Sequence, residues 1–305
     1  MKPRTWAVLV ALLLSSGIGA VYAYVRLQTL NHTTVTAPGP DLRLHRIADS
    51  AAPPLLGWRP IVLFGEVHDN AAQHALRLEG FKALLQAGAR PALLMEQFDR
   101  ERQPEIDRIR ASVPRPSTEQ IILAGSGEST SGGSRWNWAY YRPLIELALM
   151  HDLPIVAANV SRGDARRVIA DGLAAHGFDA QVPPDVERAQ AEAIERSHCD
   201  MIDGARAKRM AAAQIARDQA MARLIETHAA RGVVLLAGNG HVRTDIGVPR
   251  WLTPATRERA EAIGLLEEGD LEAGAREAYD RVFTTPRQPR TDPCEGMRTA
   301  ASTRT

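Results

Sequence analysis

The sequence predicts an α/β protein, with a mainly parallel sheet, helices on both faces, and a single domain with helical insertions. Two observations lead to this fold class. Short apolar runs of strand length alternate along the chain with longer helical segments. Two of these runs end in Gly-x-x-His, at residues 65–68 and 238–241. Ligands bind at the carboxyl ends of strands in such sheets, so one pocket with His68 and His241 at its rim is expected.

Four apolar runs have the length and composition of buried strands. They cover residues 61–64, 91–96, 153–159 and 232–237, and a fifth strand is expected around residues 279–284. Helices are expected over residues 71–86, 144–151, 161–176, 184–198 and 204–230, with a short amphipathic helix near residues 256–264. Residues 124–134 form a Ser- and Gly-rich loop, which has the composition of a lid or of a disordered insert.

The first 25 residues have the pattern of a targeting segment. Lys2 and Arg4 precede an uncharged apolar run over residues 6–25, and small residues around Ala23 suit cleavage of a signal peptide. The run is also long enough to remain as a membrane anchor. Either form places the body of the protein in the periplasm or cell envelope. The rest of the chain divides into a linker, the α/β domain and a C-terminal tail, at residues 26–54, 55–285 and 286–305.

The net charge and the cysteine content indicate which partners the protein binds and in which cellular compartment it lies. The net charge is +1, so the composition carries no signature of nucleic-acid binding. The two cysteines, Cys199 and Cys294, can form a disulfide in an oxidising compartment and tie the tail to the domain. The alternative is a pair of free thiols. Their spacing is not that of a metal-binding pair.

Four ionisable residues fall at or just after predicted strand ends: Glu66, His68, Glu96 and His241. Two imidazoles and two carboxylates from separate strands can hold a metal ion or carry out acid–base chemistry. In a metal site, His68, Glu96 and His241 would be the ligands and Glu66 would activate water. The alternative is that each of these residues only caps a helix or holds a loop.

The longest predicted helix contributes polar residues to the same pocket. Gln214 and Arg217 interrupt a mostly apolar stripe on this helix, and Asp218 lies beside the stripe. Buried polar groups need partners. Gln214 and Arg217 therefore either bind an anion, such as a carboxylate, or belong to an internal salt bridge from Arg217 to Glu66 or Glu96.

An aromatic segment, residues 136–143, follows the Ser/Gly loop. Its tyrosines, Tyr140 and Tyr141, have two interpretations. A tyrosine phenolate can ligate haem iron, or the two rings can form a hydrophobic plug with Trp136 and Trp138. Five other histidines have the pattern of surface residues: His32, His45, His74, His151 and His176.

Several motifs, taken in order, resemble one protein family. They are Gly65-Glu-Val-His68-Asp-Asn, Met95-Glu96-Gln97-Phe98, Ala158-Asn159, His198-Cys199, Ala213-Gln214-Ile-Ala-Arg217-Asp218-Gln-Ala-Met221-Ala222 and Gly238-Asn239-Gly-His241. Together they resemble the ChaN-like haem-binding uptake family. This family belongs to a superfamily that includes the Tiki metalloproteases, the TraB-type proteins and the erythromycin esterases. The resemblance covers residues 55–285.

The resemblance implies an exported or lipid-anchored bacterial protein linked to iron or haem uptake, with haem held between two subunits by a tyrosine. The resemblance to Tiki-like members implies in addition that the chain has a metal-dependent site. That site would correspond to His68, Glu96 and His241, with Glu66 close by. The chain departs from the family in one respect, because it has no lipobox cysteine.

The sequence therefore predicts an exported protein that binds haem or another iron porphyrin. Tyr140 or Tyr141 is expected to be the axial ligand, and arginines are expected to pair with the propionates. The other expected ligand-binding residues are Asn159, Gln214, Arg217 and Asn239. A homodimer and association with the inner membrane are consistent with the resemblance. The alternatives are a metal-dependent hydrolase that uses a divalent ion and a non-catalytic envelope scaffold.

Overall fold

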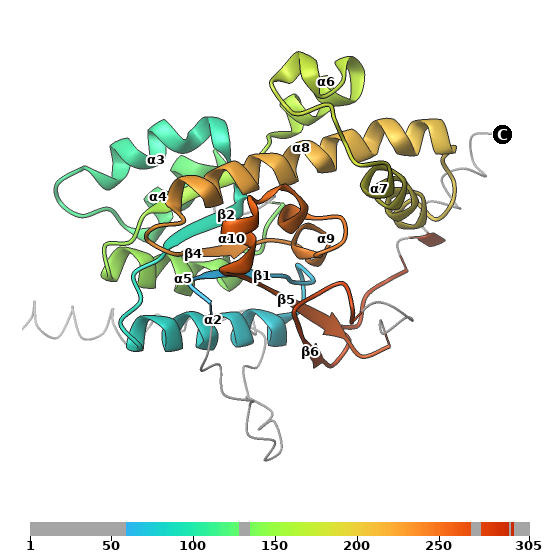
Figure 1. Cartoon of the computed structure of the whole chain (residues 1–305). Helices are drawn as coiled ribbons and strands as arrows, with labels where there is room; N and C mark the ends of the chain where they lie inside the picture. The colour runs from blue at the N-terminus through green and yellow to red at the C-terminus, as the bar shows by residue number, and fades with distance from the viewer. Residues whose placement is uncertain (1–58, 128–134, 270–275, 293, 296–305) are drawn as a thin grey trace, which may run out of the picture. The chain divides into compact units, whose positions relative to one another are not determined.

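The computed structural model describes residues 59–127, 135–269, 276–292 and 294–295. These residues contain a six-stranded sheet of order β3-β2-β4-β1-β5-β6, in which every neighbouring pair is parallel (Figure 1). The predicted class, an α/β protein with a mainly parallel sheet, is confirmed. The strands are β1 (Ile61–Phe64), β2 (Ala92–Asp99), β3 (Ile155–Asn159), β4 (Val233–Leu236), β5 (Ala260–Glu267) and β6 (Arg281–Thr285).

Helices cover both faces of this sheet. The helices α2 and α5 lie on one face and α8 lies on the other (Figure 1). Side chains of α2 and α5 pack in one apolar cluster of the sheet, and side chains of α8 pack in the cluster on the opposite face. The α-helices are α2 (Ala71–Gln86), α3 (Gln103–Arg110), α4 (Thr118–Ser126), α5 (Trp138–Met150), α6 (Arg162–Asp171), α7 (Pro184–Ser197), α8 (Gly204–His228), α9 (Asn239–Val242) and α10 (Pro254–Glu258). The short 3-10 helices are η1 (Arg100–Arg102), η2 (Ala174–His176) and η3 (Val248–Trp251).

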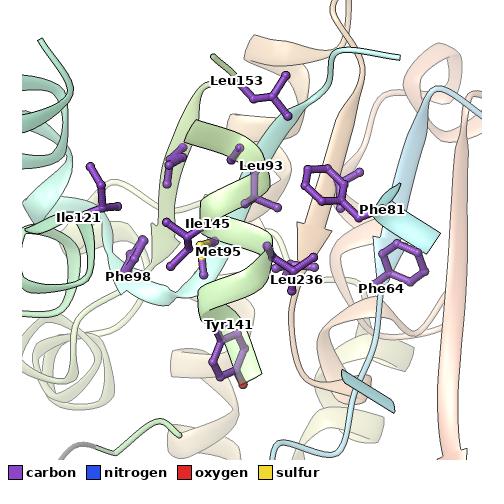
Figure 2. Packing of buried hydrophobic residues seen from close by; sticks show 14 of the residues in the cluster. Phe64, Phe81, Leu93, Met95, Phe98, Ile121, Tyr141, Ile145, Leu153 and Leu236 are labelled. Atoms are coloured by element: carbon purple, nitrogen blue, oxygen red, sulfur yellow. The ribbon is translucent and has the colours of Figure 1, made fainter. Parts of the chain in front are cut away.

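β1 is buried on both faces because its side chains alternate between two apolar clusters. Val62 and Phe64 belong to the cluster that contains side chains of α2 and α5, part of which is shown in Figure 2. Ile61 and Leu63 pack on the opposite face with side chains of α8. Tyr141 of α5 lies at one end of the first cluster, and its hydroxyl points away from the other labelled side chains (Figure 2). The polar end of this core therefore lies beyond the carboxyl end of the sheet.

Most predicted elements form close to their expected positions. β1 and α2 have the predicted bounds, residues 61–64 and 71–86. α5 begins earlier than expected, at Trp138, because the Asn137 side chain caps its first turn and the helix accommodates Pro143. The aromatic segment is therefore mostly helical.

The short helix predicted near residues 256–264 is wrong. The helix α10 ends at Glu258, and the next segment is the strand β5, which pairs with β1 and with β6. Ile263 and Leu265 are buried in this strand. Apolar residues in so short a segment fit a helix face or a strand, and the pairing with two neighbouring strands decides between them.

The C-terminal tail is tied to the domain at two places. The Arg290 guanidinium donates to Glu267, at the end of β5, at 2.7 and 2.8 Å, and to Asp69 at 2.7 Å. Further along, Cys294 forms a disulfide with Cys199, which lies between α7 and α8. The predicted disulfide is thus confirmed, and the tail connects the end of β5 with the α7–α8 turn.

The predicted signal peptide or anchor, residues 1–25, and the linker, residues 26–54, lie outside the described residues. No helix in the described part of the chain combines the length and the apolar character that a bilayer crossing needs.

Replacing Glu267 with glutamine should lower the free energy of unfolding by about 3 kcal/mol, because Arg290 loses the anion that it surrounds. Hydrogen bonds from Arg290 lower the Glu267 pKa from 4.5 to about 2. The stabilisation is therefore complete above about pH 4.5 and is lost as the pH falls through 2. Urea unfolding at neutral and acid pH measures this. The control Glu79→Gln, which removes an exposed ion pair, should cost less than about 1 kcal/mol. Equal losses would contradict the assignment.

Candidate functional site

A cavity of about 670 Å³ lies at the carboxyl ends of the strands. The ends of β1, β2, β3 and β4 contribute to it because these four strands are consecutive neighbours in the sheet. Helices α7 and α8 supply another wall. The polar residues predicted at strand ends, and the polar pair predicted on the long helix, all line this cavity: Glu66, His68, Glu96, Asn159, Gln214, Arg217, Asn239 and His241.

Glu66 follows β1, and its side chain has no exposed surface. Its carboxylate pairs with Arg77 of α2, accepts a hydrogen bond of 2.6 Å from the Tyr141 hydroxyl, and lies 2.8 Å from Nδ1 of His68. Burial alone would raise the pKa of Glu66, but Arg77 and His68 outweigh burial and lower this pKa to about 2. Glu66 is therefore an anion whose charge is balanced from inside the protein.

His68 is oriented by this carboxylate. Because ionised Glu66 can only accept, Nδ1 of His68 donates to it, and Nε2 is left for other partners. The His68 side chain is 47% exposed and meets Trp136 edge-on, with ring centroids 4.8 Å apart. Burial lowers the His68 pKa, but Glu66 and Glu96 outweigh it and raise this pKa. A Cβ on Gly238 would lie 3.1 Å from Cε1 of His68, so this close approach favours glycine.

His241 forms a second imidazole–carboxylate pair. Its Nδ1 lies 2.6 Å from Asp218, which is fully buried on α8 and accepts a hydrogen bond of 3.1 Å from Gln190 of α7. Its Nε2 lies 3.6 Å from Glu96, whose other oxygen accepts from the Gly238 amide at 2.7 Å. Burial lowers the His241 pKa, but Asp218 and Glu96 raise it overall, while burial raises the Asp218 pKa to about 6. Both cavity histidines therefore have Nδ1 on a buried carboxylate.

Arg217 contacts neutral groups. Its Nε donates to the Asn159 side chain and its Nη1 to the Gln214 side chain, each at 3.2 Å. Within the described residues it forms no ion pair. The internal salt bridge from Arg217 to Glu66 or Glu96, one of the two interpretations of the sequence, is therefore not formed. Burial lowers the Arg217 pKa, because the charged guanidinium loses hydration.

Tyr140 and Tyr141 are absent from the lining of the cavity. Tyr141 is fully buried, and its hydroxyl donates to Glu66. Burial and the Glu66 charge raise the Tyr141 pKa, so this side chain stays a neutral phenol. Tyr140 stacks on His74, with ring centroids 4.3 Å apart. The structure thus places both tyrosines in the layer that supports the cavity from the α2–α5 side.

Sequence reasoning missed most of this supporting layer. His74, predicted at the surface, is buried; its Nε2 donates to the His68 carbonyl at 3.0 Å and its Nδ1 accepts from Arg77 at 3.0 Å. Burial lowers the His74 pKa to about 4. A signal for α2 was present, because Gln73, His74 and Arg77 place polar groups at helical spacing directly after the turn. No comparable pattern in the sequence indicated that Gln190 supports the cavity.

The predicted metal ligands, His68, Glu96 and His241, all line the cavity. The described residues nevertheless contain no group of three or more His, Cys, Asp or Glu side chains arranged to hold a metal ion. The Nδ1 atoms of both histidines face carboxylates, and one Glu96 oxygen accepts from a backbone amide. The arrangement suits hydrogen bonding and proton exchange better than a closed ligand set.

The fold and the site define an α/β protein with a polar ligand cavity at its strand ends. The family model described as haem-binding uptake, Tiki superfamily, ChaN matches residues 56–252, and the chain belongs to this family. ChaN of Campylobacter jejuni, solved in a study of cofacial haem binding, has a similar fold, with a TM-score of 0.58 and 18% identity over 73% of this chain and 86% of that chain.

A mutant of the erythromycin esterase EreC, in its open conformation, also shows similarity, with a TM-score of 0.41 and 12% identity over 70% of this chain and 71% of that chain. The comparison with curated proteins found no match. At 18% identity the ChaN structure shows a common fold, and the function of this chain has to be argued from its own residues.

Replacing Asp218 with asparagine should lower the pKa of His241, because the carboxylate that stabilises the imidazolium is removed. An NMR titration of the histidine side chains measures this shift. His228 lies on the same helix without a carboxylate among the causes of its own pKa shift, so it serves as the internal control and should not move. If the His241 pKa stays constant in the variant, the proposed pairing is incorrect.

Proposed function

We propose that this protein binds haem, or a related iron porphyrin, in the cavity at the strand ends. Two observations support the proposal. The chain belongs to the haem-binding uptake family, and the related Campylobacter jejuni ChaN, which shares its fold, was solved in a study of cofacial haem binding. The cavity volume of about 670 Å³ lies in the range of small-molecule and cofactor sites.

The observation that carries the proposal is the arrangement of His68. A histidine that ligates a metal usually donates its other ring N–H to a carboxylate or carbonyl, which fixes the ring and makes the ligating nitrogen more basic. His68 has this arrangement, because Nδ1 donates to Glu66 and Nε2 is left for another partner. Haem would supply an iron that a histidine nitrogen can coordinate. We propose His68 Nε2 as that ligand.

This proposal differs from the tyrosine ligand that the sequence suggested. Tyr141 would have to leave Glu66 and lose its proton, and burial together with the Glu66 charge opposes this loss. Tyr140 would have to leave its stacked position on His74. His68 can keep its contact with Glu66, because Nδ1 makes that contact and the side chain is already half exposed at the cavity.

We further propose that the protein acts in the cell envelope, in iron or haem uptake. The N-terminal basic and apolar pattern supports export, and the Cys199–Cys294 disulfide is the kind of bond that oxidising compartments preserve. A homodimer with haem between its subunits, and association with the inner membrane, belong to the same proposal. Fractionation of cells and size measurement with and without haem would test these parts. No observation favours the metal-dependent hydrolase as a second function.

Titration of the full-length chain with haem should give a saturable shift of the Soret band. His68→Ala should weaken binding about tenfold or more, because an axial bond worth at least about 1.4 kcal/mol is lost. His151→Ala is the matched control, since this residue caps the far end of α5 and should leave the titration unchanged. A flat titration of the unmodified protein would refute haem binding. A shift that survives His68→Ala but is lost in Tyr140→Phe or Tyr141→Phe would return the ligand to tyrosine.

A further inference from the structure

Arg217 is a charged side chain that forms no direct ion pair within the described residues. It lines the cavity and donates hydrogen bonds to the neutral side chains of Asn159 and Gln214. A guanidinium cannot lose its proton under ordinary conditions, and a largely desolvated charge is costly unless an opposite charge balances it. Within the part of the chain that the structure describes, no carboxylate is paired with Arg217.

The acidic residues of the site are engaged elsewhere. Glu66 is surrounded by Arg77, His68 and the Tyr141 hydroxyl. One oxygen of Glu96 accepts from a backbone amide, and the other lies on the His241 side. The carboxylates of Glu66 and Glu96 therefore have hydrogen-bond or ion-pair partners other than Arg217. Arg217 therefore lines the cavity without a direct ion pair to any carboxylate of the described residues, although Glu96 and Asp218 lie near enough to stabilise its charge.

Arg135 adds a second guanidinium to the same cavity. Its Cζ lies 5.5 Å from the centre of the Trp136 ring, and it has no ion pair among the described residues. Burial lowers the Arg217 pKa, the charges of Glu96 and Asp218 partly offset this effect, and the Arg135 charge adds to it because the two guanidinium groups repel each other. An anion placed between them would relieve the repulsion and would give Arg217 the direct ion pair that it does not form with any described residue.

We propose that Arg217 and Arg135 form an anion subsite that binds carboxylate groups of the cavity ligand. The planar fork of a guanidinium matches the two oxygens of a carboxylate, and Asn159 and Gln214 hold the Arg217 fork in place. The choice of haem propionates as these carboxylates rests on the proposed function. The argument for an anion rests on charge and burial alone. The subsite therefore makes the cavity selective for porphyrins with free carboxylates.

The test compares haem with its dimethyl ester, in which both propionates are neutral, by absorbance titration of the full-length chain. The unmodified protein should bind haem about 10- to 100-fold more tightly than the ester, as expected for charge-assisted hydrogen bonds. Arg217→Gln should remove most of this preference by weakening haem binding and leaving ester binding unchanged. Arg209→Gln, an exposed arginine on the same helix, is the matched control and should keep the full preference.

Arg135→Gln gives an independent test if Arg217→Gln fails to fold, because Arg135 is exposed and its replacement does not disturb the core. It should reduce the preference for haem by about two- to fivefold, which is the range of an exposed charge pair. The subsite is overturned if the unmodified protein binds haem and ester equally, or if both arginine variants weaken the two ligands to the same extent.

A second probe separates failure of the subsite from failure of the proposed function. If neither porphyrin binds, the chain is titrated with phthalate, a small aromatic dicarboxylate, at constant ionic strength. Trp136 lines the cavity beside Arg135, so its fluorescence reports occupancy, and Trp136→Phe identifies its share of the signal. A saturable phthalate response that weakens in Arg217→Gln would uphold the subsite without haem. No response to phthalate would overturn it.

Discussion

The buried ion pair between Glu66 and Arg77 is the interaction on which the site depends. Both side chains are completely removed from solvent. Such a pair adds little net stability. Removing either partner leaves an unpaired buried charge, which lowers the free energy of unfolding by about 3–5 kcal/mol. The pair joins the turn after β1 to helix α2, and the Tyr141 hydroxyl adds helix α5 to the same carboxylate. His68 is oriented on Glu66, so the direction of its ring is set by three elements of the core.

Two carboxylates of the site are balanced by partners inside the protein. Glu66 is paired with Arg77, and Asp218 contacts His241 and accepts a hydrogen bond from the side-chain amide of Gln190. Imidazoles and guanidinium groups line the cavity together with Glu66 and Glu96. α7 carries Gln190, and the turn that follows α7 is tied to the tail by the disulfide. The wall of the cavity that α7 forms is therefore anchored by a covalent bond.

Much of the fold was readable from the sequence because buried parallel strands have a strong local pattern. The apolar runs before Gly65 and Gly238, and the polar residue at each strand end, were sufficient to place β1, β4 and their turns. The segment that forms β5 was predicted to be a helix, because apolar residues interrupted by Glu261 and Gly264 in so short a segment fit a helix or a strand. Its pairing with β1 and β6 identifies it as a strand.

The residues that line the cavity were predicted better than those that support it. Strand order brings the four strand ends together, and any parallel order with β1, β2, β3 and β4 adjacent would have this result. The roles of Arg77, His74 and Gln190 depend on how helices pack over the sheet, which no local pattern encodes. The same packing turns Tyr141 toward Glu66 and away from the ligand position that the resemblance suggested.

The most direct test of this account is electron paramagnetic resonance of the ferric haem complex of the full-length chain. The account predicts hyperfine coupling from one imidazole nitrogen, because Glu66 holds His68 with Nε2 available to iron. This coupling should be lost in His68→Ala and retained in Tyr140→Phe. An iron signal with phenolate ligation that is unchanged by His68→Ala would contradict the account, because the carboxylate-oriented histidine would then have no part in binding haem.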